Sequence, residues 1–153
     1  LNPVVAEEAR ERLHSVVTGD IAEVDPGGPF DAILALELFE HLPRPEPVLN
    51  RLGSLLRPGG RIVLSVPNVG HHSVVRDLLA GRWDYLPIGL LCYTHYRFFT
   101  RRTLEDWIRR AGFHRFTLVP QTTPVPEEML ELPLAGIDRE SLATKGFWAL
   151  IEG

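Results

Sequence analysis

The chain has 153 residues, of which 44% are hydrophobic and 24% are charged, a composition typical of one soluble globular domain. A net charge of −4 and an isoelectric point near 5.9 argue against a general binder of nucleic acid or of anionic membranes. A single cysteine, Cys92, excludes an internal disulfide, and no apolar run approaches the roughly 18 residues of a membrane span. We therefore expect a cytoplasmic protein. The first residue is Leu, which fits a processed chain or a segment of a longer one.

The first 29 residues are polar and rich in turn-forming residues. Asn2 and Pro3 are typical of the cap and first position of a helix. The range 14–18 predicts a short strand that Gly19 and Asp20 close, and a turn-rich loop follows over 25–29.

The stretch from Phe30 to Pro67 organises the rest of the chain. Phe30–Leu36 is a short apolar run that suits a strand buried on both faces of a parallel sheet. Apolar residues at helical spacing over 48–56 predict an amphipathic helix, and 61–66 predicts a second strand. Together they make a βαβ unit. Ligands bind beyond the carboxyl ends of strands in such sheets, so the polar residues over 37–41 lie on the side where chemistry occurs.

The remaining elements are expected in the second half of the chain. Residues 74–80 predict a short helix, and 82–99 form an irregular aromatic stretch. Thr100 is expected to cap a helix that Gly112 follows. Further strands are expected over 113–119 and 147–151, with a loop over 120–126 and a weak helix over 127–143 between them.

Five motifs carry a family resemblance by their order: VVTGD, FDAILALELFEHL, LLRPGGRIVLSVPN, HYRFFTRRTLEDWIRRAGF and FWALIEG. The series resembles the class I S-adenosylmethionine-dependent methyltransferases, and more narrowly the bacterial small-molecule methyltransferases with an E-x-x-E-H-L loop after the fourth strand. The resemblance implies an α/β fold of Rossmann-like, doubly wound type, with a mostly parallel sheet and an antiparallel last strand. It also implies S-adenosyl-L-methionine as cofactor and methyl transfer to a small-molecule acceptor. We expect one domain over 1–153, in which 68–99 forms an acceptor-site insert or lid.

One part of the family pattern does not occur in this sequence. Family members begin with a strand and a glycine-rich turn of D-x-G-x-G-x-G type that wraps the methionine part of the cofactor. The glycine pairs here, Gly27-Gly28 and Gly59-Gly60, have no such spacing. We therefore expect a domain truncated at the N-terminus, carrying the C-terminal two-thirds of the fold, and weak or no cofactor binding by this chain alone.

The missing strands also predict an open sheet edge. In the family's strand order, 3-2-1-4-5-7-6, they lie between the strands predicted over 14–18 and 30–36. An open apolar edge tends to pair with another chain. Three outcomes are open: a partner chain covers the edge in a homodimer, the N-terminal segment fills it, or the recorded sequence is incomplete.

Four cofactor-binding residues are carried over from the family. Asp20 matches the acid that accepts a hydrogen bond from the adenine amino group, with Ile21 beside it, and the alternative for Asp20 is a turn-forming role. Glu37 matches a residue beside the methionine moiety, or is a solvated loop acid. Leu38 packs near the cofactor, or simply in the core.

The catalytic and substrate residues are less constrained. His41 is the candidate general base, because an imidazole titrates near neutral pH, but His41 and Glu40 could equally brace the loop. Asn68 follows the predicted second strand of the βαβ unit and could contact a substrate. The other candidate substrate residues lie in the insert: His95, Tyr96 and Arg97, of which Arg97 suits an anionic acceptor.

Two alternatives concern metals and function. The pair His71-His72 has no cysteine or carboxylate cluster at ligand spacing, so no metal site is predicted. The second functional hypothesis is a non-catalytic binding or scaffolding remnant of the same fold. A dinucleotide enzyme of similar topology is disfavoured, because no dinucleotide fingerprint is present.

Overall fold

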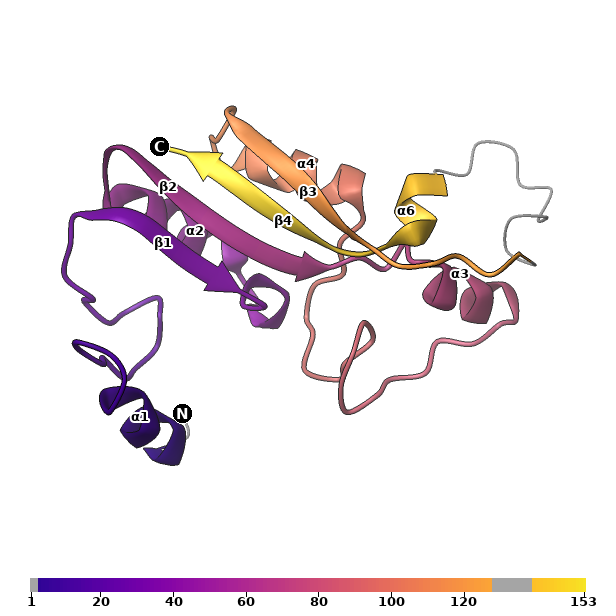
Figure 1. The fold of residues 1–153 in the computed structure, drawn as a ribbon, viewed down its shortest axis with the longest axis horizontal. Helices are drawn as coiled ribbons and strands as arrows, with labels where there is room; N and C mark the ends of the chain where they lie inside the picture. Colours follow the sequence, from indigo (N-terminus) through magenta and orange to yellow (C-terminus); the bar gives the residue numbers. More distant parts are fainter. Residues whose placement is uncertain (1–2, 128–138) are drawn as a thin grey trace.

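The computed structural model describes residues 3–127 and 139–153, which are arranged around one four-stranded sheet (Figure 1). The strand order is β1-β2-β4-β3. The elements in chain order are α1 (Pro3–Arg10), β1 (Phe30–Leu36), the 3-10 helix η1 (Phe39–His41), α2 (Pro45–Ser54), β2 (Leu56–Pro67), α3 (His72–Leu79), α4 (Arg101–Arg110), β3 (Phe116–Thr122), α6 (Arg139–Ala143) and β4 (Thr144–Glu152).

The predicted βαβ unit is confirmed. β1 pairs in parallel with β2, with Ala35 opposite Leu64, and α2 connects the two strands. β4 is antiparallel to both of its neighbours, β2 and β3, so β1, β2 and β3 all run in one direction. The predicted fold class, a mostly parallel sheet with an antiparallel last strand, is therefore confirmed.

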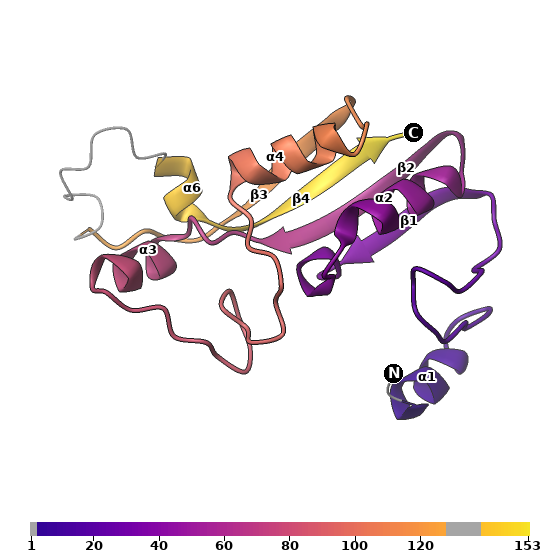
Figure 2. The ribbon, with the colours of Figure 1, turned by 180° about the vertical axis from the view of Figure 1, so that it is seen from behind.

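The core lies between the sheet and two helices. Figures 1 and 2 show α2 and α4 on the same face of the sheet. Alternate residues of β2 and β4 point toward them, because side chains alternate between the two faces of a strand. The fully buried members of this layer include Leu49 of α2, Leu104 and Ile108 of α4, Ile62 and Leu64 of β2, and Phe147, Ala149 and Ile151 of β4.

The opposite face of the sheet is apolar and exposed. Leu34 and Leu36 of β1 are 69% and 44% exposed, and Val119 of β3 is 53% exposed. Within the described ranges no helix covers this face, and β1 has no strand on its outer side (Figure 1). The predicted open edge is thus seen in the part of the chain that the structure describes.

The strand predicted over 14–18 is wrong. These residues are irregular, and most of their side chains are exposed. A strand needs a hydrogen-bonded neighbour, and the described residues offer none at this point, because the segment lies away from the sheet with α1 (Figure 1). None of the residues of α1 is buried either.

Other predictions are confirmed with shifted boundaries. The helix over 74–80 is α3, and the strands over 61–66, 113–119 and 147–151 are β2, β3 and β4. β3 extends through Thr122, so the predicted loop over 120–126 begins later. Of the helix predicted over 127–143, α6 forms the last turn, and residues 128–138 lie outside the described residues. No described helix is long and apolar enough to cross a membrane.

Candidate functional site

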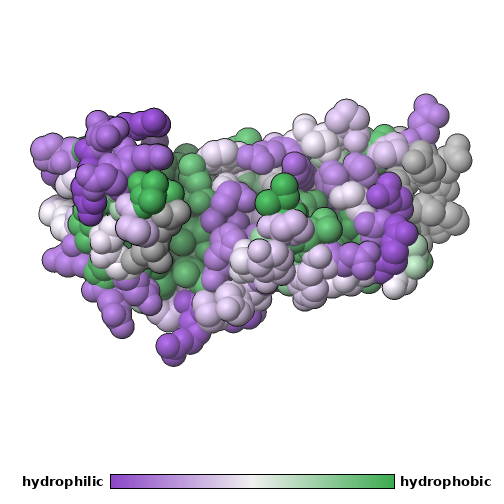
Figure 3. Space-filling model, turned by 90° about the horizontal axis from the view of Figure 1, so that it is seen from below, coloured by the Kyte–Doolittle hydropathy of each residue, from purple (hydrophilic) through white to green (hydrophobic). Residues whose placement is uncertain are grey.

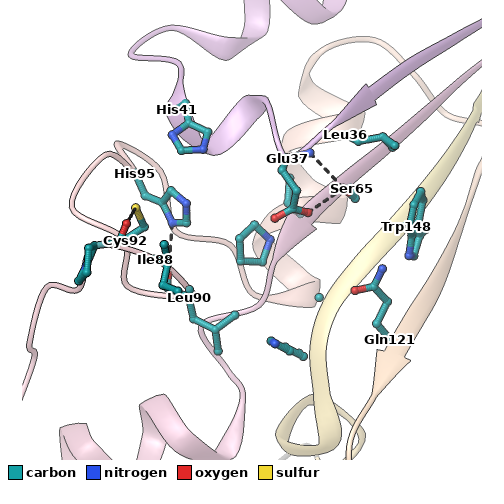
Figure 4. A pocket seen from close by; sticks show the side chains of 16 residues that line it. Leu36, Glu37, His41, Ser65, Ile88, Leu90, Cys92, His95, Gln121 and Trp148 are labelled. Atoms are coloured by element: carbon teal, nitrogen blue, oxygen red, sulfur yellow. Dashed lines mark hydrogen bonds between the residues drawn. The ribbon is translucent and has the colours of Figure 1, made fainter. Parts of the chain in front are cut away.

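A cavity of about 620 Å³ opens at the carboxyl ends of β1 and β2 (Figure 4). The predicted insert forms one wall, and β3 and β4 form the wall opposite. The lining side chains with polar or charged groups are Glu37, His41, Ser65, His95, Gln121, Lys145 and Trp148. Ile88 and Leu90 of the insert add apolar surface. The cavity therefore combines an acid, a base, imidazoles and apolar walls.

Glu37 has an unusual backbone conformation at the mouth of this cavity. Its φ of 48° lies in the left-handed region, which non-glycine residues seldom adopt. The end of β2 holds it there, because the Glu37 amide donates to the Ser65 carbonyl over 3.2 Å. The Ser65 hydroxyl also donates to the Glu37 carboxylate over 2.7 Å (Figure 4). Strained residues of this kind concentrate at functional sites. In this conformation the Glu37 side chain lines the cavity beside Ser65 (Figure 4).

Glu40 lies directly behind the cavity wall, in η1. Its side chain is fully buried, and neither carboxylate oxygen has a hydrogen-bond partner among the described residues. Burial, with a smaller contribution from the negative charge of Glu37, raises the pKa of Glu40 to about 7. Burying a carboxylate without a hydrogen-bond partner costs free energy of folding. Packing alone therefore does not explain why a glutamate occupies this position.

The rings of His41 and His95 lie edge to face on one side of the cavity, with centroids 4.7 Å apart (Figure 4). They come from segments 54 residues apart in the chain. The insert is fastened to η1 because the amides of Tyr96 and Arg97 donate to the Glu40 carbonyl, over 2.7 and 3.1 Å. Burial lowers the pKa of His95, so its neutral form is favoured.

Each of these imidazoles is oriented by a backbone carbonyl. The Nδ1 atom of His41 lies 3.2 Å from the Thr94 carbonyl oxygen, and that of His95 lies 3.3 Å from the Leu90 carbonyl oxygen. A carbonyl can only accept, so both contacts place the proton on Nδ1. The Nε2 atom of each ring is then left with a lone pair.

A second, smaller cavity of about 270 Å³ lies between the N-terminal segment and β1. It is lined almost wholly by apolar side chains, including Ile21, Pro26, Ile33 and Leu38. Figure 3 shows hydrophobic atoms gathered in a hollow beside the N-terminal segment. Ile21 and Leu38 also pack against the main core. This smaller cavity is therefore an apolar site.

The structure therefore brings together some of the predicted site residues and leaves others outside both cavities. Glu37, His41 and His95 share the larger cavity, and Ile21 and Leu38 share the smaller one. Asp20 is exposed, and its carboxylate accepts from the Ala22 amide over 2.8 Å, as the turn-forming alternative predicts. Its role at the adenine stays a prediction.

The other three predicted substrate residues line neither cavity. Asn68 is fully buried, and its side-chain amide donates to the backbone carbonyls of Ser141 and Thr144. Tyr96 and Arg97 are exposed, and the Arg97 guanidinium donates to the Pro43 carbonyl. These contacts brace the loops around the cavity, and the predicted substrate contacts stay predictions.

Several cavity residues were missed by the sequence reasoning. Ser65 carried a signal, since it is the polar residue that interrupts the apolar run of β2. Gln121, Lys145 and Trp148 carried none, because their position depends on β3 and β4 lying next to the end of β2. Glu40 was read as a bracing residue, and its complete burial could not be inferred from a polar loop.

Comparison with known proteins places these features in a family. The model of the methyltransferase domain family matches residues 3–116, which is more than half of the chain. A Xylella fastidiosa protein named ubiquinone biosynthesis O-methyltransferase is 34% identical over 124 residues, covering 67% of this chain and 46% of that protein. The chain spans about half the length of the curated relatives it matches.

Solved structures agree on the fold. A Thermotoga maritima structure, described as a SAM-dependent methyltransferase and possible histamine N-methyltransferase, has a TM-score of 0.67 at 20% identity and covers 96% of this chain and 68% of its own. A Burkholderia thailandensis N-methyltransferase, solved with S-adenosylhomocysteine bound, has a TM-score of 0.52 at 22% identity and covers 98% of this chain and 55% of its own. The chain thus belongs to the methyltransferase domain family, a class I family whose cofactor is S-adenosylmethionine.

Proposed function

We propose that this chain takes part in the transfer of a methyl group from S-adenosylmethionine to a small-molecule acceptor. The observation that carries the proposal is the geometry of Glu37, which is held in a left-handed conformation at the carboxyl ends of two parallel strands. There its carboxylate faces a cavity large enough for a small molecule. Ligand sites of open α/β sheets lie at this end of the strands.

The described residues fit two parts of the cofactor. The apolar hollow formed by Ile21, Leu38 and their neighbours suits the adenine ring, and Asp20 precedes it in the chain. The Glu37 carboxylate suits the positively charged methionine part, because opposite charges at close range attract. When bound, S-adenosylmethionine supplies the methyl group from its sulfonium. The printed sequence contains no G-x-G-x-G turn, so the backbone that would cradle the methionine part is not among these residues.

The volume of the larger cavity favours a small molecule as the methyl acceptor. Its volume of about 620 Å³ lies within the range of pockets that enclose small molecules, roughly 300–1,000 Å³. Trp148 and the apolar residues of the insert offer flat surface, while Gln121 and Lys145 offer hydrogen-bond donors. This lining suits an aromatic or partly apolar acceptor that carries oxygen or nitrogen atoms, in line with the O-methyltransferase name of the curated relative.

The first test is a titration of the chain with S-adenosylmethionine and S-adenosylhomocysteine, followed by amide chemical shifts in NMR spectra. This method detects the weak binding that we expect from this chain alone. Shifts should concentrate at Ile21, Glu37 and Leu38. The Glu37→Gln substitution should weaken the binding of S-adenosylmethionine by about 1 kcal/mol, roughly fivefold in affinity, because the variant has no carboxylate beside the cationic sulfonium.

Glu37→Gln should lower the affinity for S-adenosylhomocysteine less, because this ligand lacks the sulfonium charge. Glu46→Gln, on the exposed first turn of α2, is the matched control and should change neither affinity. Shifts confined to other parts of the chain, or equal affinities in Glu37→Gln and the parent protein, would contradict the proposal. Such a result would favour the binding or scaffolding alternative.

A further inference from the structure

We propose that Lys145 binds a carboxylate of the methyl acceptor, so that the larger cavity selects acidic acceptors over neutral ones of the same shape. This inference deepens the proposed function and rests on it. Of the 16 lysine and arginine residues in the sequence, Lys145 is the single lysine. It is also the only lysine or arginine among the described residues that line the larger cavity. An anion that enters this cavity therefore has one cationic side chain to bind.

The backbone holds Lys145 at the start of β4, beside the end of β2. The Lys145 carbonyl accepts from the Asn68 amide over 2.8 Å. The next residue, Gly146, pairs with Pro67 of β2. This pairing is close, because a Cβ atom added at Gly146 would lie 2.9 Å from the Val66 carbonyl oxygen. Lys145 thus projects from a paired strand at the edge of the sheet where ligands bind, and a strand positions a side chain more precisely than a loop does.

The charges around Lys145 leave its ammonium available to a ligand. No carboxylate in the described ranges forms an ion pair with it. Its recorded electrostatic neighbours are basic: burial, then the charge of His72 and then that of Lys145 lower the pKa of His71 to about 4. An ammonium among basic groups, at the wall of a cavity, attracts an anion from solution.

Lys145 and Glu37 belong to different ends of the cavity. Glu37 directly follows β1, and β2 lies between β1 and β4 in the sheet. Neighbouring strands are about 4.8 Å apart, so the backbones of β1 and β4 are about 10 Å apart across the sheet. The cofactor is proposed to lie at the Glu37 end. An anion at Lys145 therefore belongs to the acceptor, whose reacting atom lies toward Glu37 and whose carboxylate lies toward β4.

Two further side chains of this wall suit the same ligand. Figure 4 shows Gln121 and Trp148 on the side of the cavity opposite the insert. Trp148 follows Lys145 by three residues, about 10 Å along an extended strand, and its indole offers a flat surface for the body of the acceptor. Gln121 pairs with Gly146, and its side-chain amide lies 3.4 Å from the place of a Cβ atom there. This amide can donate a second hydrogen bond to a carboxylate at Lys145.

The balance of charge favours a carboxylate over a phosphate group. A phosphate monoester carries about 1.5 to 2 negative charges at pH 7. Glu37 already brings a carboxylate to the cavity, and the described lining offers one lysine and no arginine. A carboxylate carries a single charge, which one ammonium balances. In this proposal Lys145 takes the part that the sequence suggested for Arg97, whose guanidinium donates to the Pro43 carbonyl outside the cavity.

The test uses the single lysine as its reporter. Protein labelled with ¹³C at the lysine ε carbon gives one lysine signal from this sequence. The probes are benzoate, cinnamate and 3-(4-hydroxyphenyl)propanoate, each beside its primary amide, titrated without S-adenosylmethionine. We expect at least one acid to shift this signal saturably and to bind about tenfold more tightly than its amide, because hydrogen bonds between charged groups are the stronger ones.

Two variants at the same position separate charge from shape. Lys145→Gln should lower the affinity for the acid about tenfold, to that of the amide, and Lys145→Arg should keep most of it because the cation is retained. The indole N–H signal of Trp148 replaces the lysine reporter in both variants. Arg110→Gln removes one positive charge from an exposed position of α4 outside the cavity, and it is the matched control that should bind as the parent does.

Three results would overturn the proposal: no saturable binding of any acid, equal affinities for acids and amides, or an unchanged acid affinity in Lys145→Gln. S-adenosylhomocysteine, which has a carboxylate of its own, distinguishes the two sources of the anion. Its affinity should be the same in Lys145→Gln and the parent, and a loss there would assign the anion to the cofactor and overturn the proposal as well. Because the acids are titrated without cofactor, their failure is distinct from a failure of the Glu37→Gln experiment.

Discussion

His71 links the stability of the fold to pH. Burial lowers its pKa from an ordinary 6.5 to about 4, with smaller contributions from the charges of His72 and Lys145. The folded state therefore holds His71 neutral, and the unfolded state takes up a proton more readily. Its contribution to stability is complete above pH 6.5 and is lost as the pH falls from 6.5 toward 4.

We expect acidification from pH 7 to pH 4.5 to lower the free energy of unfolding by about 1–3 kcal/mol through this residue. Urea unfolding at the two pH values measures the loss. His71→Gln should show a smaller loss than the parent protein, and the difference isolates His71 because all other groups titrate in both. His114→Gln should keep the full loss. An equal loss in His71→Gln and the parent would show that His71 does not set the pH dependence.

At the same scale, the sequence allowed a residue to be assigned only when its neighbours in the chain determine its surroundings. Glu37 and His41 directly follow a predicted strand, so their place at the carboxyl edge could be predicted. His95 was predicted from its position in the insert, but its contact with His41 depends on the backbone hydrogen bonds from 96 and 97 to Glu40. The left-handed φ of Glu37 could not be read from the sequence, because glutamate has no preference for it.

Among the helices and strands, α4 has the clearest start signal in its own sequence. Thr100 is its cap and Thr103 completes the capping box, with the Thr103 hydroxyl accepting from the Thr100 amide over 2.8 Å. Thr100→Ala should lower the free energy of unfolding by about 1 kcal/mol, because the cap is lost from a helix that covers the core. Urea unfolding would measure this. Thr100→Ser should be nearly neutral, and an equal loss in both variants would mean that the methyl group, not the cap, stabilises α4.

Elements differ in how far the sequence determines them. β1 was predicted with its observed bounds and α4 with its observed start, since a seven-residue apolar run and a threonine cap are local signals. The strand predicted over 14–18 does not form, because a strand also needs a partner. Its sequence is compatible with a strand, but the segment lies with α1, away from the open edge of β1 (Figure 1).

For the molecule as a whole, the exposed edge of β1 and the apolar face beside it predict self-association. Unpaired edges of this kind readily pair with another chain. We propose that the chain associates through β1, so light scattering should show a mean mass that rises with concentration. Leu34→Lys should reduce the association, since lysine on an edge strand opposes pairing.

Leu79→Lys replaces a similarly exposed leucine of α3, away from the sheet edge, and should leave the association unchanged. A parent chain that stays monomeric at every concentration would contradict the proposal. An association that is weakened equally by both variants would indicate general hydrophobic attraction rather than pairing at β1.

The attachment of the insert to the Glu40 carbonyl has a consequence for how such a domain diverges. The two donors are main-chain amides, which every residue except proline possesses. The side chains of Tyr96 and Arg97 can therefore change without loosening the hold on η1. Exposed side chains of the insert, such as Ile88 in the cavity wall, can vary in evolution while Glu37, Glu40 and His41 keep their geometry, so the shape of the cavity can change through substitutions in a single segment.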